Sequence, residues 1–162
     1  MEKSLAQLTV RDFMSRHVVS VSPEDTVHEA MVLLQENLLS SLPVTNGAEK
    51  VVGILSARDI LDWAEEMDDG VANLVEVSDY YRDWMMSQAG KESQAVKVQE
   101  LMNDQVVTVS QDASLSEVVS SLLRNEIHHL PVVDTKGRMV GFVSNTDVLR
   151  IVAKTLEQLS LA

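Results

Sequence analysis

The 162-residue sequence has no cysteine, so neither a disulfide framework nor a thiolate site is available. Basic residues are also scarce: 13 lysines and arginines stand against 25 acidic residues, a formal net charge of −12. A protein that binds duplex nucleic acid needs a basic surface, so this balance argues against a nucleic-acid partner. No apolar run approaches the length of a membrane span, and the first ten residues lack a signal-peptide pattern. These absences predict a cytoplasmic protein that has no membrane partner.

Aromatic residues are few, and most of them lie in one acidic stretch. Residues 62–97 carry 3 basic and 9 acidic residues, which is half of the negative excess. Within this stretch, residues 71–86 have the pattern of an amphipathic helix, and 87–97 that of a polar linker. Four of the six aromatic side chains lie there: Trp63, Tyr80, Tyr81 and Trp84. They suit packing against the rest of the domain, which we favour, or a partner or dimer surface.

The strongest positive feature is an internal repeat. With an offset of 88, residues 10–61 align with 98–149 without a gap, and 17 of the 52 positions are identical. Two copies of one supersecondary unit predict a pseudo-twofold fold with paired sites where the halves meet. The predicted organisation is a lead segment at 1–9, repeat 1 at 10–69, an insert at 70–97 and repeat 2 at 98–162.

Each repeat predicts the element order β-α-β-β-α, which gives an α/β (α+β) fold class. Thr26-x-x-Glu29 and Ser114-x-x-Glu117 match capping boxes at helix starts, and apolar residues follow both at helical spacing. Turn residues separate two further short apolar runs, as in a hairpin. The predicted strands cover 18–21, 42–44 and 51–55 in the first copy, and 106–109, 130–133 and 139–143 in the second.

One motif ends each hairpin: Gly-h-h-Ser-x-x-Asp, where h is apolar. It occurs as Gly53 to Asp59 and again as Gly141 to Asp147. The pattern predicts a strand that runs into a helix N-terminus, where free amides and the helix dipole favour an anion. An aspartate in the first turn can accept hydrogen bonds from both hydroxyls of a ribose. The same Ser-x-x-Asp spacing is also that of a simple helix cap, and both interpretations stay open.

The order and duplication of these motifs resemble the cystathionine-β-synthase (CBS) domain, and the pair resembles a CBS tandem, or Bateman module. The shared features are an M-x-x-x-V-V-(S/T)-V-S opening, a helix, an h-P-V strand, a turn and G-h-h-S-x-x-D. The resemblance implies a non-catalytic regulatory module that binds AMP, ADP, ATP or S-adenosylmethionine between the repeats. It also implies a homodimer and a regulated partner protein, with no required cofactor.

The resemblance further implies two nucleotide pockets, each combining the Ser-x-x-Asp of one repeat with strand residues of the other. Asp59 and Asp147 would bind ribose hydroxyls, and Arg58 and Thr146 would lie towards the phosphates. The first pocket would contain Ser56, Arg58, Asp59, Thr108, His128 and His129. The second would contain Ser144, Thr146, Asp147, Ser20, Ser40 and Ser41.

The two predicted pockets are not equivalent. Arginine grips phosphate through charge-assisted hydrogen bonds, so the pocket with Arg58 is expected to be the better nucleotide site. His128 and His129 are interpreted as phosphate-facing or surface residues rather than metal ligands, because neither a cysteine nor an acidic pair accompanies them. No nucleophile with an oriented base and no P-loop appears. The alternative function is a dimeric interaction scaffold whose nucleotide sites have degenerated.

Overall fold

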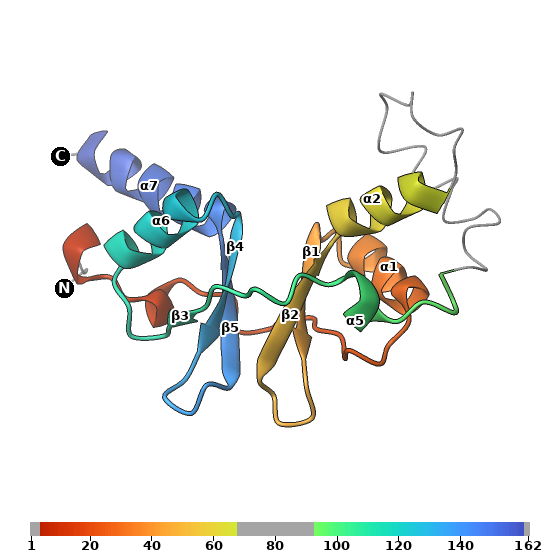
Figure 1. Ribbon diagram of the computed structural model, residues 1–162. Helices are drawn as coiled ribbons and strands as arrows, with labels where there is room; N and C mark the ends of the chain where they lie inside the picture. The colour runs from red at the N-terminus through yellow and green to blue at the C-terminus, as the bar shows by residue number, and fades with distance from the viewer. Residues whose placement is uncertain (1–3, 68–92, 161–162) are drawn as a thin grey trace. The chain divides into compact units, whose positions relative to one another are not determined.

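The computed structural model describes residues 4–67 and 93–160 (Figure 1). The predicted helix at 71–86 and the side chains of Tyr80, Tyr81 and Trp84 lie outside these residues. Two compact units make up the described chain. One contains the described residues of Met1–Val18 and Val107–Ala162, and the other those of Val19–Val106. We call them the second-repeat unit and the first-repeat unit, after the repeat that supplies most of each.

The first-repeat unit is an antiparallel hairpin with helices on one face (Figure 1). Leu42 of β1 pairs with Leu55 of β2, and both are fully buried against the helices. Val21 adds a single parallel bridge to Val44 at the other edge of β1. The elements are α1 (Val27–Glu36), β1 (Ser41–Thr45), β2 (Val51–Ser56), α2 (Ala57–Met67) and α5 (Val98–Leu101).

The second-repeat unit has the same plan. Its three-stranded sheet has the order β3-β4-β5, with β3 parallel and β5 antiparallel to the central β4. Leu130 and Val143 occupy the positions of Leu42 and Leu55 and are also fully buried. The elements are the 3-10 turns η1 (Leu5–Gln7) and η2 (Val10–Asp12), then β3 (Val109–Ser110), α6 (Leu115–Arg124), β4 (His129–Val133), β5 (Met139–Ser144) and α7 (Asn145–Ser160). The predicted fold class is confirmed.

The two repeats exchange their leading segments. The Ser15 amide donates to the Phe142 carbonyl at 2.9 Å, and the Phe142 amide donates back to Ser15 at the same distance. The equivalent residues 88 positions on, Asn103 and Ile54, exchange the same pair of bonds at 2.9 and 3.0 Å. Residues 4–18 therefore complete the second repeat, and 93–106 complete the first. The predicted borders at 10–69 and 98–162 are those of the sequence repeat. The compact units have different borders, because each contains the leading segment of the other repeat.

Both capping boxes form as predicted. The Thr26 amide donates to Glu29 Oε2 at 2.7 Å, and the Glu29 amide donates to Thr26 Oγ1 at 3.1 Å. Ser114 and Glu117 make the same two bonds at 2.7 and 3.2 Å. These bonds use backbone donors that a helix start otherwise leaves unpaired. They also lower the pKa of both glutamates, because they favour the ionised carboxylate.

The strand predicted at 18–21 was wrong in extent. Only Val21 pairs, whereas its counterpart Val109 begins the two-residue strand β3. In the second repeat the Gln111 amide extends the pairing by donating to the Val133 carbonyl at 3.1 Å. The residue at the corresponding position of the first repeat is Pro23, which has no amide hydrogen to donate. The strand predicted at 106–109 is likewise reduced to Val109–Ser110.

Of the four aromatic residues in the acidic stretch 62–97, Trp63 is the one that lies within the described residues. Its side chain is partly buried and packs against the core of the first-repeat unit. For this residue, packing against the domain is the interpretation that the structure supports.

Candidate functional site

The Ser-x-x-Asp motif caps a helix in both repeats. The amide and hydroxyl of Ser56 donate to Asp59 Oδ2 at 2.7 and 2.6 Å, and the Asp59 amide donates back to Ser56 Oγ at 3.2 Å. Ser144 and Asp147 repeat the three bonds at 2.8, 2.8 and 3.3 Å. The capping interpretation is therefore correct. Each carboxylate uses one oxygen in the cap, so the second oxygen decides what else the motif can bind.

The second carboxylate oxygen differs between the repeats. Asp147 Oδ1 accepts a hydrogen bond from Arg150 Nη1 at 3.1 Å. The bonds of Asp59 with Ser56 use Oδ2 and the backbone amide, and no other described residue donates a hydrogen bond to Asp59 Oδ1. Asp59 consequently keeps an oxygen that can accept from two adjacent ligand hydroxyls, while at Asp147 a ligand would have to displace Arg150.

The arginine predicted to reach phosphate is itself paired. Arg58 Nε donates to Asp62 Oδ1 at 2.7 Å, one turn further along α2. Asp62 and Arg150 occupy equivalent positions of the two repeats, and neither was singled out from the sequence. Their spacing of four from Arg58 and three from Asp147 is the spacing at which helix side chains meet, and this signal could have identified them.

The residues just before each h-P-V strand motif were predicted to bind nucleotide, and in each repeat they lie at the strand start next to the helix cap. Ser41 lies opposite Ser56 across the hairpin, and the Ala57 amide donates to the Ser40 carbonyl at 2.9 Å. Ser41 is 7% exposed, and its hydroxyl has no hydrogen-bond partner among the described residues. A buried hydroxyl without a partner costs roughly 1–3 kcal/mol, so this position favours an additional polar partner.

The corresponding positions of the second repeat hold the two histidines. His129 lies opposite Ser144 and stacks on Phe142, with ring centroids 5.6 Å apart and planes 17° apart. His128 is exposed, and its Nδ1 lies 2.9 Å from Asn145 Nδ2. The two side chains therefore have different surroundings, as expected for adjacent residues at a strand start.

Burial lowers the pKa of His129 below its usual 6.5. The neighbouring His128 lowers this pKa further, while Asp147 raises it. The folded state thus favours the neutral imidazole, and the unfolded chain takes up the proton first as the pH falls.

We expect the free energy of unfolding to fall as the pH drops below about 6.5, and His129→Gln to weaken this dependence. Melting temperatures measured from pH 7.5 to 5 test it. The carboxylates with lowered pKa values lose their contribution only below their usual 4.5, outside this window. The exposed His17→Gln is the control, and an equal pH slope in His129→Gln and wild type would contradict the assignment.

The remaining predicted residues lie close to the same elements. Ser20 precedes the Val21 bridge, and its hydroxyl accepts from Thr45 at 3.5 Å; Thr108 is exposed and precedes β3. Thr146 is exposed in the first turn of α7. Within each unit, the structure brings the Ser-x-x-Asp motif next to the strand start of its own repeat. The predicted pockets, which join Ser-x-x-Asp of one repeat to residues of the other, remain a prediction.

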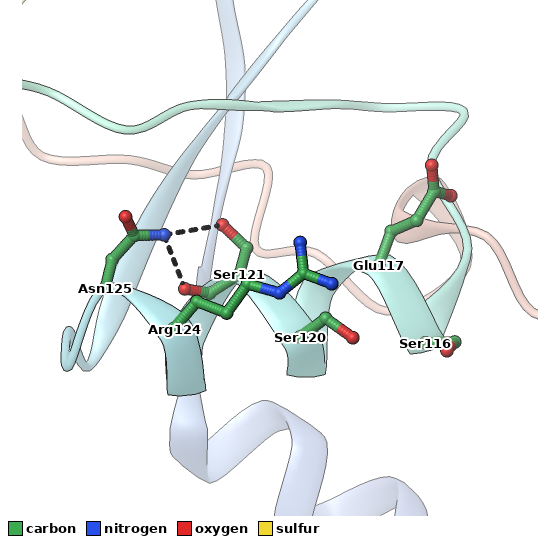
Figure 2. Close-up of a pocket in the computed structure, with 6 residues that line it drawn as sticks. All are labelled: Ser116, Glu117, Ser120, Ser121, Arg124 and Asn125. Carbon is green, nitrogen blue, oxygen red and sulfur yellow. Dashed lines mark hydrogen bonds between the residues drawn. The ribbon is translucent and has the colours of Figure 1, made fainter.

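A shallow pocket of about 250 Å³ lies elsewhere, on the outer face of α6 (Figure 2). Asn125 Nδ2 donates to the Ser121 carbonyl at 2.8 Å in its wall, and Glu117 belongs to the capping box. These bonds serve the two ends of α6. The lining residues are Ser116, Glu117, Ser120, Ser121, Arg124 and Asn125, none of them predicted from the motifs.

Neither a metal site nor a membrane-spanning helix is present within residues 4–67 and 93–160. No group of three His, Cys, Asp or Glu side chains in these segments is arranged to hold a metal ion. No helix in them combines the length and the apolar character needed to cross a bilayer.

The two units are copies of one α+β module, and the comparisons with known proteins agree. The profile of the CBS domain matches residues 10–66 and 98–154, so the chain belongs to the CBS domain family and contains two copies of the domain. Curated relatives include inosine-5'-monophosphate dehydrogenase of Methanocaldococcus jannaschii, 27% identical over 83% of this chain and 22% of that protein. Another is the chloroplastic CBSX1 of Arabidopsis thaliana, 29% identical over 88% of this chain and 63% of that protein.

Solved structures show the same architecture. Protein MJ1225 of M. jannaschii is 25% identical, with a TM-score of 0.73 over 91% of this chain and 51% of that one. The CBS-pair protein CBSX2 of A. thaliana is also 25% identical, with a TM-score of 0.72 over 92% and 96%. The chain spans only 22% of the dehydrogenase and 49% of the curated protein MJ1225, so their overlap is with part of each protein.

Proposed function

We propose that this chain is a non-catalytic regulatory module that binds an adenine nucleotide or S-adenosylmethionine and signals to a partner protein. The observation that carries the proposal is the duplicated carboxylate at a helix start, Asp59 in α2 and Asp147 in α7. Each carboxylate accepts two hydrogen bonds from its serine, and the aspartate amide donates a third back to the serine hydroxyl. A fixed carboxylate at a helix N-terminus, where the helix dipole favours negative charge, suits a ligand that carries both a diol and an anionic group.

A nucleotide has that combination of groups. Its ribose hydroxyls would donate to the carboxylate, and its phosphate would lie towards the helix N-terminus. The Ser41 hydroxyl, which has no partner among the described residues, supplies a further polar contact in the pocket assigned to Asp147. We propose the same two pockets that the family resemblance implies from the sequence. Ser56, Arg58 and Asp59 act with Thr108, His128 and His129, and Ser144, Thr146 and Asp147 act with Ser20, Ser40 and Ser41.

Related structures support this ligand class. CBSX2 has been solved in complex with AMP, with a TM-score of 0.69 and 24% identity to this chain. The CBS domain pair of protein MJ0100 has been solved with 5'-methylthioadenosine and S-adenosyl-L-methionine, at a TM-score of 0.69 and 21% identity. At these identities the likeness is one of fold, and the ligand class for this chain is our proposal.

Isothermal titration calorimetry with AMP, ADP, ATP and S-adenosylmethionine tests the function. We expect saturable binding with one tighter site per chain, because the two carboxylates have different second partners. Two equal sites would contradict the predicted difference between the repeats. No heat with any of the four compounds, together with no shift in melting temperature, would contradict the sensor function itself.

The second candidate is an interaction scaffold, and one surface favours it. Three apolar side chains of α7 are exposed at helical spacing: Leu149 by 65%, Val152 by 42% and Leu156 by 58%. Exposed apolar residues grouped on one element are typical of a surface that binds another protein. Homodimer formation through this surface is compatible with either function. A chain that dimerises but gives no ligand-dependent change would favour the scaffold.

A further inference from the structure

The two helices that begin at the Ser-x-x-Asp motifs carry side chains of opposite charge at one equivalent position, about one turn after the aspartate. Asp62 of α2 and Arg150 of α7 stand 88 positions apart and are equivalent in the repeat. The sequence of α2 contains one basic residue and four acidic ones, whereas the first eleven residues of α7 contain two basic and one acidic. The scaffold of the two motifs is thus conserved between the copies while their electrostatic surroundings are reversed.

In the first repeat the acidic residue is paired with Arg58, the residue predicted to contact the phosphate. Arg58 Nε donates to Asp62 Oδ1 at 2.7 Å, with the two side chains 78% and 50% exposed. An ion pair between two exposed side chains is weak, so it does not prevent Arg58 from contacting a ligand. The carboxylate nevertheless stays within one side-chain length of any phosphate that Arg58 binds.

We propose that Asp62 is a specificity-determining residue that disfavours multiply charged phosphate ligands at the first-repeat site. The inference rests on the proposed nucleotide function and extends it to the charge of the ligand. A fixed negative charge near the phosphate repels it in proportion to the ligand's own charge. The site consequently favours adenosine compounds with little negative charge, such as a monophosphate, over a triphosphate.

The size of the effect follows from Coulomb's law. At about 7 Å in a water-like dielectric, one unit charge changes the affinity about twofold to threefold per ligand charge. ATP carries about two more negative charges than AMP, so removing the Asp62 charge is expected to raise the ratio of ATP to AMP affinity about fivefold. The gain should shrink as salt is added, because both groups are exposed to solvent.

A role for Asp62 in positioning Arg58 would give a different change in ligand affinity. If the carboxylate mainly held Arg58 in place for a phosphate, its loss would weaken AMP and ATP alike. Adenosine, which has no phosphate, would bind unchanged under either role. The dependence on ligand charge therefore separates the two.

The test is calorimetric titration of the full chain with adenosine, AMP and ATP, comparing Asp62→Asn with the unsubstituted protein. Both are prepared in an Asp147→Asn background, so that the first-repeat site dominates the signal. Glu66→Gln is the matched control, since it removes the same charge from the exposed end of α2, two turns beyond Arg58. We expect the ATP-to-AMP affinity ratio to rise about fivefold in Asp62→Asn and to change by less than twofold in Glu66→Gln.

Each other outcome overturns a defined statement. An unchanged ratio, an equal loss of AMP and ATP affinity, or an equal rise in both variants would overturn the specificity role while leaving nucleotide binding intact. Absence of binding by all three compounds in the unsubstituted protein, with Asp147 restored, would overturn the proposed function and this inference together. Circular dichroism melts of each variant confirm that the differences do not arise from unfolding.

Discussion

Replacing both Asp59 and Asp147 with alanine is expected to abolish the stabilisation of this protein by adenine nucleotides. A ligand that binds only the folded state at one hundred times its dissociation constant raises the free energy of unfolding by about 2.7 kcal/mol. The double variant should show none of this increase, because each replacement removes the proposed ribose acceptor. A thermal-shift series with AMP, ADP and ATP measures the effect.

The substitutions also remove helix caps, so the unliganded variant will be less stable. Each aspartate accepts two hydrogen bonds from its serine, through the Oδ2 atom. Loss of a capping side chain typically costs about 1 kcal/mol. The lowered baseline must be separated from the lost response to ligand.

The protein contains its own matched control. Glu29 and Glu117 close capping boxes of the same form at α1 and α6, but they are not among the proposed ligand residues. Glu29→Ala with Glu117→Ala should lower the stability by a similar amount and keep the nucleotide response. A nucleotide-dependent shift that survives loss of both aspartates, or one that disappears equally in both double variants, would refute the assigned ribose role.

The second large effect is expected at Gly141, where the exchanged segment crosses β5. A Cβ atom at this position would lie 2.6 Å from Met14 Sδ and 2.9 Å from the Ser15 carbonyl oxygen. Ser15 is bound to Phe142 by two backbone hydrogen bonds and cannot withdraw without breaking them. We expect Gly141→Ala to lower the free energy of unfolding by about 1–3 kcal/mol, measured by urea denaturation.

Two other glycines provide the comparison. A Cβ at Gly53 would meet the Met102 side chain, which is flexible, so Gly53→Ala should cost less than Gly141→Ala. At Gly47 nothing lies within 4 Å, and Gly47→Ala should be close to neutral. Equal costs at Gly141 and Gly47 would show that the leading segment does not pack against β5 in solution.

The fold was predictable to a large extent because its signals are local and duplicated. Thr26-x-x-Glu29 and Ser114-x-x-Glu117 each predict a helix start from four consecutive residues, and both form. Two short apolar runs separated by turn residues predict a hairpin in each repeat, and Leu42 and Leu55 pair in the first one. The limits of the first strands were less predictable, because pairing there depends on a partner some twenty residues away and on the missing amide of Pro23.

The candidate site was predictable in residue type but not in the partners of those residues. Ser-x-x-Asp indicated a capped helix start with an available carboxylate, and the caps are present in both repeats. The motif could not show that Arg58 is paired with Asp62 or that Arg150 binds Asp147. The spacing of Asp62 and Arg150 brings their side chains onto the same helix face as Arg58 and Asp147, but the rotamers that form each pair are specified only by the structure.

The sequence by itself determined the duplication, the order of elements and the residues that recur in both copies, since these follow from an offset of 88 and from short-range hydrogen bonding. Only the tertiary structure decided that the leading segments are exchanged, with fully buried Val10 in the core of the second repeat and its counterpart Val98 in that of the first. The equivalent segments at 10–14 and 98–102 share their valine and methionine and present similar apolar side chains to either repeat. Which repeat each segment completes is therefore set by chain connectivity and long-range packing rather than by the local pattern.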